Sequence, residues 1–124
     1  MGPSSDYNQY KVQEKITVKD AATQISDNEL HMVVVVDEQE NVIGVLTDTD
    51  LSRKIGTGIN LSNQGVDEVM NKSITSVTES ATIATVLNTM KSSGHNKVIV
   101  KTSDGKFRGV YDKKEIVREI KNRL

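Results

Sequence analysis

The 124-residue chain contains no cysteine, no tryptophan, one proline and one phenylalanine. Without cysteine it can form neither disulfides nor thiolate metal sites, and its two histidines, His31 and His95, are too few for a histidine-rich metal site. Because aromatic residues make up only 3% of the chain, a core has to be built from Val, Ile, Leu, Met and Ala. Disulfide scaffolds and such metal centres are therefore excluded.

An excess of one charge and long apolar runs are also missing. The chain has 16 basic and 17 acidic residues, which argues against nucleic acid as a main target. Its longest apolar run, Met32 to Val36, is far shorter than the roughly 20 residues of a membrane span. The first residues lack the apolar region of a secretory signal. We therefore expect a soluble, cytoplasmic protein without a membrane partner.

The chain repeats itself without a gap at a distance of 65 residues, the separation of Gly44 and Gly109 (109 − 44). The period is longer than that of solenoid repeats and there are only two copies, so we expect two half-domains packed face to face. Further matched pairs are Val12 and Val77, Thr17 and Thr82, Val35 and Val100, Val45 and Val110, and Arg53 and Arg118.

Each copy predicts the order β-α-β-β-α. The expected strands are β-branched runs followed by turn residues, at 10–12, 33–36 and 42–46 and again at 75–77, 98–100 and 107–111. Thr17 and Thr82 are expected to cap the first helix of each copy, and the closing helices are expected to begin near Asp50 and Glu115. Residues 56–65 read as a linker, followed by a short helical turn around Val66.

These features resemble a known family. The pattern VVVVD-x6-GVLTDTDL is similar to the cystathionine β-synthase (CBS) domain, and the doubling with the lead-in VDEVM resembles a CBS pair, or Bateman module. The resemblance implies an α/β (α+β) fold of two β-α-β-β-α repeats related by pseudo-twofold symmetry. We expect a tag or disordered N-terminus at 1–8, the first repeat at 9–58, a linker and lead-in turn at 59–70, and the second repeat at 71–124.

The resemblance implies a regulatory module rather than an enzyme. Such pairs bind adenosine-containing ligands in clefts between the repeats: AMP, ADP, ATP, S-adenosylmethionine or NAD. No cofactor is required, and the expected partners are this small molecule, a second copy in a homodimer, and an effector protein or upstream domain. A structural, dimerising pair without a ligand is an alternative. A small enzyme is less supported, because the motif region contains no nucleophile–base pair and no metal cluster.

The family motif Gly-x-x-Thr-x-x-Asp falls at residues 44–50. By resemblance, Thr47 donates its hydroxyl to a ligand phosphate and Asp50 accepts from both ribose hydroxyls. A carboxylate has two acceptor oxygens, which suits a vicinal diol, and a helix N-terminus favours phosphate. However, Thr-x-x-Asp after a strand is also how an ordinary helix is capped, so both readings stay open.

Other residues are assigned to the site by the same resemblance. Apolar side chains and neighbouring backbone are expected to contact the adenine base, and a basic residue is expected to neutralise phosphate from the next helical turn. The first group comprises Lys11, Val12, Val33, Val34 and Leu46, Met32 is expected at the edge of the cleft, and the basic residue is Arg53.

The second copy departs from the motif. Its Thr position is Asp112 and its Asp position is Glu115. An ionised Asp112 would repel a phosphate, and Glu115 is one methylene longer than aspartate. With Tyr111 and Ser76 these residues make up a degenerate second site. We therefore expect an asymmetric pair, with its better-formed site at Asp50.

Overall fold

The computed structural model describes residues 7–28, 31–58, 60 and 62–124. The chain divides into two compact units, one of Asn8–Ile74 and one of Thr75–Leu124 together with Met1–Tyr7. Each unit contains one copy of the repeat. The expected tag at 1–8 lies outside the described residues except for Tyr7 and Asn8, which begin the 3-10 turn η1 (Tyr7–Tyr10). No helix in the described part of the chain has the length and apolar character needed to span a membrane.

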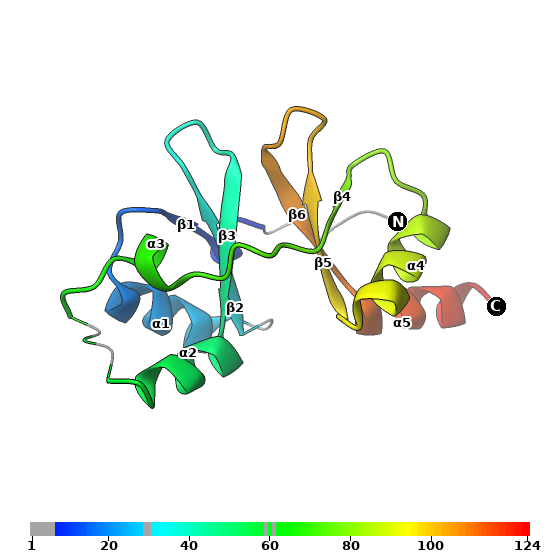
Figure 1. Cartoon of the computed structure of the whole chain (residues 1–124). Helices are drawn as coiled ribbons and strands as arrows, with labels where there is room; N and C mark the ends of the chain where they lie inside the picture. The colour runs from blue at the N-terminus through cyan, green and yellow to red at the C-terminus, as the bar shows by residue number, and fades with distance from the viewer. Residues whose placement is uncertain (1–6, 29–30, 59, 61) are drawn as a thin grey trace. The chain divides into compact units, whose positions relative to one another are not determined.

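The first unit has the predicted β-α-β-β-α order and adds one helical turn (Figure 1). In its three-stranded sheet the middle strand pairs in parallel with the first and antiparallel with the third. The elements are β1 (Lys11–Gln13), α1 (Val18–Asp27), β2 (Met32–Val36), β3 (Val42–Thr47), α2 (Asp48–Ile55) and α3 (Val66–Val69).

The second unit repeats this topology in the same register. Val12 lies opposite Val35 in the first sheet, and their counterparts Val77 and Val100 lie opposite each other in the second. Both sheets have an irregularity at the matching position of the middle strand. The elements are β4 (Ser76–Thr78), α4 (Ile83–Ser93), β5 (Lys97–Lys101), β6 (Phe107–Asp112) and α5 (Lys113–Arg123). The predicted fold class is therefore confirmed.

Capping side chains set where the helices begin. Thr17 and Thr82 cap α1 and α4 as predicted, each hydroxyl oxygen accepting from a backbone N–H three residues on, at 3.1 Å. The prediction for the closing helices was wrong by two residues, because α2 and α5 begin at Asp48 and Lys113. Thr47 and Asp112, the last residues of β3 and β6, act as the N-caps.

The two hairpins are also closed by equivalent side chains. Asp37 Oδ1 accepts from the backbone N–H of Asn41 at 3.0 Å, and Thr102, the matching residue, accepts from that of Lys106 at 3.1 Å. The Thr102 hydroxyl also donates to Asp104, which lowers the pKa of that carboxyl. A side-chain acceptor at this position therefore fixes both turns, whether it is a carboxylate or a hydroxyl.

The core of each unit lies between one face of its sheet and its helices. In the first unit, alternate strand residues pack with apolar residues of α1, α2 and α3; the members are Val12, Val18, Ala21, Ile25, Val33, Val35, Leu46, Leu51, Val66 and Val69. In the second unit the corresponding cluster contains Val86, Met90, Val98, Val100, Tyr111 and Ile116. The described part of the second unit has no counterpart of α3.

The segment around α3 is a structural part of the first unit. Val18 N–H donates to the Gln64 carbonyl and Val66 N–H donates to the Ile16 carbonyl, both at 2.9 Å. The backbones of Val45 and Asn71 exchange two hydrogen bonds, of 2.9 and 2.7 Å. The segment was expected to be a linker. Its described residues instead belong to the first unit, because the apolar side chains of α3 complete that core.

Met70 explains the first residue of the motif. A Cβ atom built on Gly44 would meet Met70 Cγ at 2.7 Å, closer than real Cβ atoms approach a neighbour. Met70 packs against the core of the first unit at this point. Gly44 therefore serves the fold by leaving room for Met70, which leaves Thr47 and Asp50 as the motif residues with chemistry to offer a ligand.

Candidate functional site

Thr47 lies at the junction of β3 and α2. Its Oγ1 accepts from the backbone N–H of Asp50 at 3.0 Å, so the capping reading of the motif is correct. A threonine hydroxyl has one donor and two acceptor lone pairs, and the cap uses one lone pair only. The hydroxyl hydrogen is not used by this bond. Capping α2 and donating to a ligand are therefore compatible roles for the same oxygen.

Asp50 lies in the first turn of α2 with its side chain only 16% exposed. Arg53 Nη1 lies 3.6 Å from Asp50 Oδ1, and the Arg53 side chain is 72% exposed. An ion pair this exposed on its basic side contributes little stability, typically below about 1 kcal/mol. The helix therefore fixes the position of Asp50, while the weak contact with Arg53 leaves its carboxylate able to accept from other hydrogen-bond donors.

The cap makes a measurable contribution to stability. We expect Thr47→Ala to lower the free energy of unfolding by about 1 kcal/mol, because Asp50 N–H loses its acceptor. Thr47→Ser keeps an acceptor and should stay close to the unmutated chain. Urea unfolding followed by circular dichroism measures both. An alanine variant as stable as the serine variant would contradict the capping role.

The second unit keeps the cap and loses the hydroxyl. Asp112 Oδ1 accepts from the backbone N–H of Lys114 at 3.1 Å and caps α5. Glu115, at the position of Asp50, is exposed. Tyr111 is 8% exposed in the core, while Ser76 is half-buried in β4 opposite Ile99. The second repeat therefore retains what the helix needs, without the donor and the sheltered carboxylate of the first.

The other predicted site residues divide between the two faces of the first sheet. Val12, Val33 and Leu46 are buried in the cluster that faces the helices, so their side chains belong to the core. Met32 pairs with Thr47, and Val34 pairs with both Lys11 and Val45. Paired residues point to the same side of a sheet. The opposite face therefore brings together four predicted residues: Lys11, Met32, Val34 and Thr47.

Two close pairs of polar side chains lie near the predicted residues of the first unit. Lys11 Nζ lies 3.0 Å from Glu40 Oε2, so its charge is already paired. His31 Nδ1 lies 3.9 Å from Asp48 Oδ2, with both side chains more than half exposed. Arg53 is thus the predicted basic residue that lies beside Asp50, and Asp48 adds a negative charge in the same helical turn.

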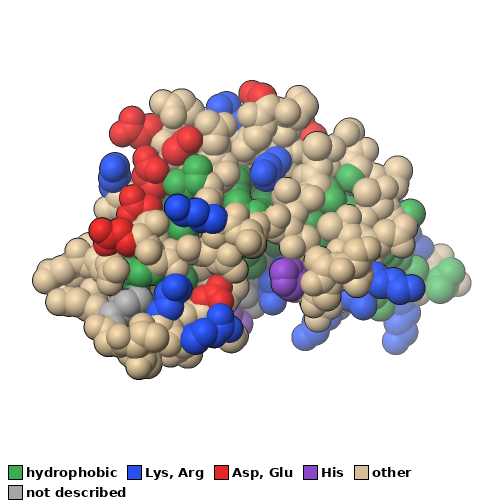
Figure 2. All heavy atoms as spheres, viewed as in Figure 1, with side chains coloured by type: hydrophobic (Ala, Val, Ile, Leu, Met, Phe, Trp, Pro, Cys, Tyr) green, Lys and Arg blue, Asp and Glu red, His purple; other side chains and the backbone are tan. Residues whose placement is uncertain are grey.

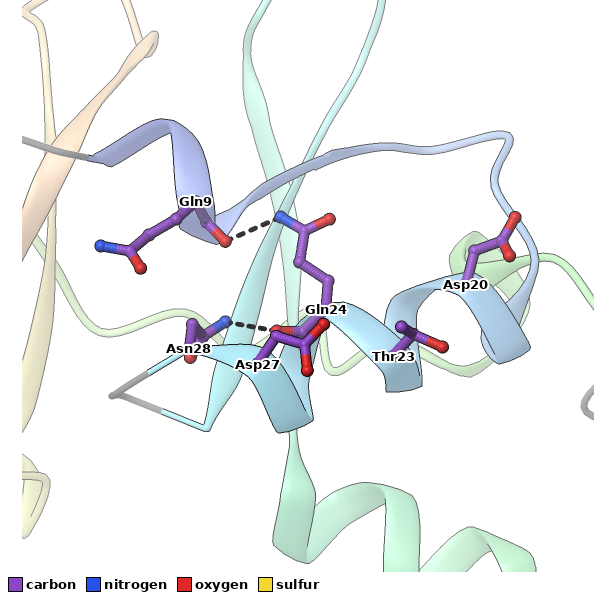
Figure 3. A pocket seen from close by; sticks show the side chains of 6 residues that line it. All are labelled: Gln9, Asp20, Thr23, Gln24, Asp27 and Asn28. Atoms are coloured by element: carbon purple, nitrogen blue, oxygen red, sulfur yellow. Dashed lines mark hydrogen bonds between the residues drawn. The ribbon is translucent and has the colours of Figure 1, made fainter.

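A polar groove that the sequence did not single out lies beside α1 (Figure 3). It measures about 340 Å³, and its lining residues are Gln9, Asp20, Thr23, Gln24, Asp27 and Asn28. Gln24 Nε2 donates to the carbonyls of Gln9 and Lys11, at 2.7 and 3.1 Å. Asn28 Nδ2 donates to the carbonyls of Gln24 and Met32, at 3.0 and 2.9 Å. These bonds tie α1 to η1 and to the first residues of the parallel strands β1 and β2, which is a structural role.

The same helix face is hollowed in the second unit. A groove of about 440 Å³ is lined by Thr85, Asn88, Thr89, Ser92 and Ser93. Each of these residues lies 65 positions after a lining residue of the first groove. A polar stripe at helical spacing was visible in both copies, but it does not distinguish a groove from a solvated helix face.

Comparison with known proteins decides the family. The family model described as the CBS domain matches residues 6–57 and 66–122, which is most of the chain and follows the two repeats. The chain belongs to the CBS domain family. Its two matches make it a CBS pair, as the 65-residue period predicted.

Two curated relatives share this CBS region. An uncharacterized 17.7 kDa protein of Acidianus ambivalens is 26% identical over 115 residues, which cover 90% of this chain and 66% of that protein. The arabinose 5-phosphate isomerase KdsD of Salmonella typhi is 31% identical over 93 residues, which cover 75% of this chain and 28% of the isomerase. The CBS pair thus spans about two thirds of one relative and little more than a quarter of the other.

Solved structures of CBS proteins have the same fold. A CBS domain protein from Pyrobaculum aerophilum complexed with AMP matches with a TM-score of 0.75 and 18% identity, covering 98% of this chain and 93% of that one. A CBS domain pair in complex with 5′-methylthioadenosine and S-adenosyl-L-methionine matches with a TM-score of 0.80 and 16% identity, covering 98% and 94%. At these identities the likeness concerns the fold.

Proposed function

We propose that this CBS pair is a cytoplasmic regulatory module whose first repeat binds an adenosine-containing ligand, of the AMP, ADP, ATP, S-adenosylmethionine or NAD class. The observation that carries the proposal is the contrast between the repeats. Asp50 is largely sheltered beside a cap whose hydroxyl hydrogen is not used, whereas the second repeat has an exposed Glu115 and a carboxylate cap. The proposal is also supported by related folds that carry AMP or S-adenosylmethionine.

The chemistry of the first repeat suits such a ligand. The two oxygens of the Asp50 carboxylate accept from the two hydroxyls of a ribose, while the Thr47 hydroxyl donates to a phosphate or carboxylate oxygen. Arg53 releases Asp50 and turns to the anionic end of the ligand. Asp48 opposes a large negative charge at this position, so the ribose contact supplies more of the affinity than the phosphate contact does.

A thermal-shift panel tests the proposal. A ligand present at about 100 times its Kd stabilises a protein by roughly 2.7 kcal/mol, which is a clear rise in melting temperature. We expect this rise with at least one of AMP, ADP, ATP, S-adenosylmethionine and NAD. If all five leave the melting temperature unchanged at millimolar concentration, the first repeat does not bind this class of ligand.

The degenerate site should be repairable in part. We expect the double variant Asp112→Thr, Glu115→Asp to raise the number of ligands bound from one toward two per chain, because it restores a hydroxyl cap and a shorter carboxylate. Isothermal titration calorimetry measures the stoichiometry. The reverse change in the first repeat, Thr47→Asp with Asp50→Glu, should abolish binding. A chain that still binds one ligand after this reverse change would place the site elsewhere.

The regulatory output needs a second component. We propose that an effector protein, or another domain of the same polypeptide, reads a ligand-dependent change in the pair. A ligand can shift such an equilibrium only by its difference in affinity for the two states. The proposal does not include catalysis, and the match to KdsD covers too small a part of that isomerase to bring its activity to this chain.

Exposed apolar residues also favour a homodimer, which is the core of the alternative function as a dimerising module. Ile55 and its repeat counterpart Ile120 are 50% and 36% exposed, and Val117 is 50% exposed on α5. Figure 2 shows Lys and Arg side chains gathered over α5, which keep this apolar stripe soluble.

The oligomeric state has a direct test. We expect light scattering to give twice the chain mass of 13.7 kDa, and the double variant Val117→Asp, Ile120→Asp to give the mass of one chain. The charge cannot be buried between two copies without a large cost. A mass of one chain for the unmutated protein at high concentration would contradict the dimer.

A further inference from the structure

The first turn of α2 has few backbone donors left for a phosphate. A helix N-terminus binds phosphate through backbone N–H groups that have no acceptor within the helix. In α2 two of the first three such groups are already used. Asp48 N–H donates to the His31 carbonyl at 3.0 Å, and that of Asp50 donates to the cap oxygen of Thr47 at the same distance. The usual attraction of a helix N-terminus for phosphate is therefore weakened here.

The same turn is negatively charged. Asp48 and Asp50 both lie in it, where they complement the positive end of the helix dipole. The Asp48 side chain is more than half exposed. Its contact with His31 Nδ1, at 3.9 Å, supplies a balancing charge only when His31 is protonated. A ligand that reaches Thr47 therefore meets a second carboxylate one residue further along the chain.

The basic residues assigned to the site do not balance this second carboxylate. Lys11 Nζ lies 3.0 Å from Glu40 Oε2, so its charge is paired. Arg53 Nη1 lies 3.6 Å from Asp50 Oδ1 and balances that carboxylate. Both basic side chains thus have an acidic neighbour of their own, which leaves the charge of Asp48 in excess. Because salt screens charges beyond about 8 Å under physiological conditions, this local excess outweighs the effect of more distant residues.

We propose that the ligand of the first repeat carries a positive charge on its 5′ substituent, as the sulfonium of S-adenosylmethionine does, and that Asp48 selects it over a 5′-phosphate. This selection rests on the proposed function, because Asp50 has to hold the ribose for the 5′ substituent to lie near the first turn of α2. The methionine part of S-adenosylmethionine has a carboxylate, which accepts from the Thr47 hydroxyl, and two cationic groups, which Asp48 attracts. A 5′-phosphate has about two negative charges at pH 7 and no cation, so it forms the same hydrogen bond against the repulsion of Asp48.

Two pairs of ligands separate the charge from the rest of the molecule. S-adenosylhomocysteine lacks only the methyl group and the sulfonium charge of S-adenosylmethionine, and adenosine lacks the phosphate of AMP. By isothermal titration calorimetry on the full chain, we expect S-adenosylmethionine to bind at least about fivefold more tightly than S-adenosylhomocysteine. One added charge about 7 Å from a carboxylate gains a factor of this order near a protein surface. AMP should bind no more tightly than adenosine.

The variant Asp48→Asn removes the charge and keeps the size of the side chain. It should reduce the preference for S-adenosylmethionine over S-adenosylhomocysteine to about twofold or less, and it should tighten AMP binding about fivefold. The matched control is Asp20→Asn, which removes a carboxylate from an exposed residue in the first turn of α1. This control should leave the preference between the two ligands of each pair unchanged.

The outcomes distinguish this selection from the proposed function. Tighter binding of AMP than of S-adenosylmethionine, or equal binding of S-adenosylmethionine and S-adenosylhomocysteine, would overturn the selection while an adenosine site at Asp50 stands. An Asp48→Asn variant with the preference of the unmutated chain would assign the selection to another residue and overturn the role of Asp48. If none of the four ligands binds, the selection and the proposed function both fail.

Discussion

Asp50→Ala is expected to weaken binding of the adenosine-containing ligand by roughly a hundredfold. The loss corresponds to about 3 kcal/mol, the scale of two hydrogen bonds to a charged group. Asp50 is 16% exposed, and the structure pairs it only loosely, with Arg53 at 3.6 Å. The carboxylate is therefore free to take both ribose hydroxyls, and its removal leaves them without acceptors. Isothermal titration calorimetry with AMP and with S-adenosylmethionine gives the two affinities.

The matched control is Glu115→Ala, which removes a carboxylate from the equivalent helical position of the second repeat. Because Glu115 is exposed and its cap residue is an acid, we expect affinity to change by less than about twofold, within the range of a screened surface charge. Both variants should keep the melting temperature of the unliganded chain within a few degrees. Equal affinity of Asp50→Ala and the unmutated chain would show that the carboxylate is not a ligand contact.

Val66→Asp is expected to cost at least about 3 kcal/mol of folding free energy, because it puts a charge in a fully buried position of the first core. Val66 is 0% exposed and packs in one cluster with Val12, Val18 and Leu46. Its backbone also holds Ile16 through a 2.9 Å hydrogen bond. Urea unfolding followed by circular dichroism gives the change in the free energy of unfolding.

Asn63→Asp provides the comparison for this charge. It adds a carboxylate in the same segment at an exposed residue, so we expect an effect within about 0.5 kcal/mol. A solvated linker would tolerate both substitutions equally well. The difference between the two variants therefore measures how far α3 belongs to the first unit.

The repeat explains why most of the fold could be predicted. Val12, Val35 and Val45 recur 65 residues later in the same pattern, and a β-branched strand at one place supports the strand at the other. The first residue of each helix depends on which side-chain oxygen accepts a hydrogen bond from the free backbone N–H groups of the first turn. Thr17 and Thr82 were recognisable caps, but Thr47 and Asp112 also end apolar strands, so α2 and α5 were placed two residues late.

The packing of α3 could not be predicted, since it depends on a contact distant in sequence. Val66 follows a polar, glycine-rich stretch, which is typical of a linker. That Val66 N–H donates to the Ile16 carbonyl, that Val18 N–H donates to the Gln64 carbonyl, and that Met70 lies over Gly44 follow only from the three-dimensional structure. The residues of the motif were identified from their pattern, but only these contacts show that Gly44 leaves room for Met70 and that Thr47 caps α2.

Which residues lie on which face of the first sheet could likewise not be predicted from the apolar pattern. Val33 and Val34 are adjacent in a run of four valines, so no alternation marks which one faces the helices. The core cluster contains Val33, and the register places Val34 beside Lys11 and Val45 on the other face. Met32 and Val34 therefore share the face of Thr47, whereas Val33 and Leu46 belong to the core beneath the helices.

The central claim is that one repeat binds an adenosine-containing ligand and the other keeps only its helix cap. A titration of the ¹⁵N-labelled chain with AMP, and separately with S-adenosylmethionine, followed by amide chemical shifts, tests it most directly. The account predicts saturable shifts at Thr47, Asp50 and Arg53, with Asp112 and Glu115 unmoved at one ligand per chain. Shifts centred on Asp112 and Glu115, or the absence of any saturable shift with either ligand, would contradict it.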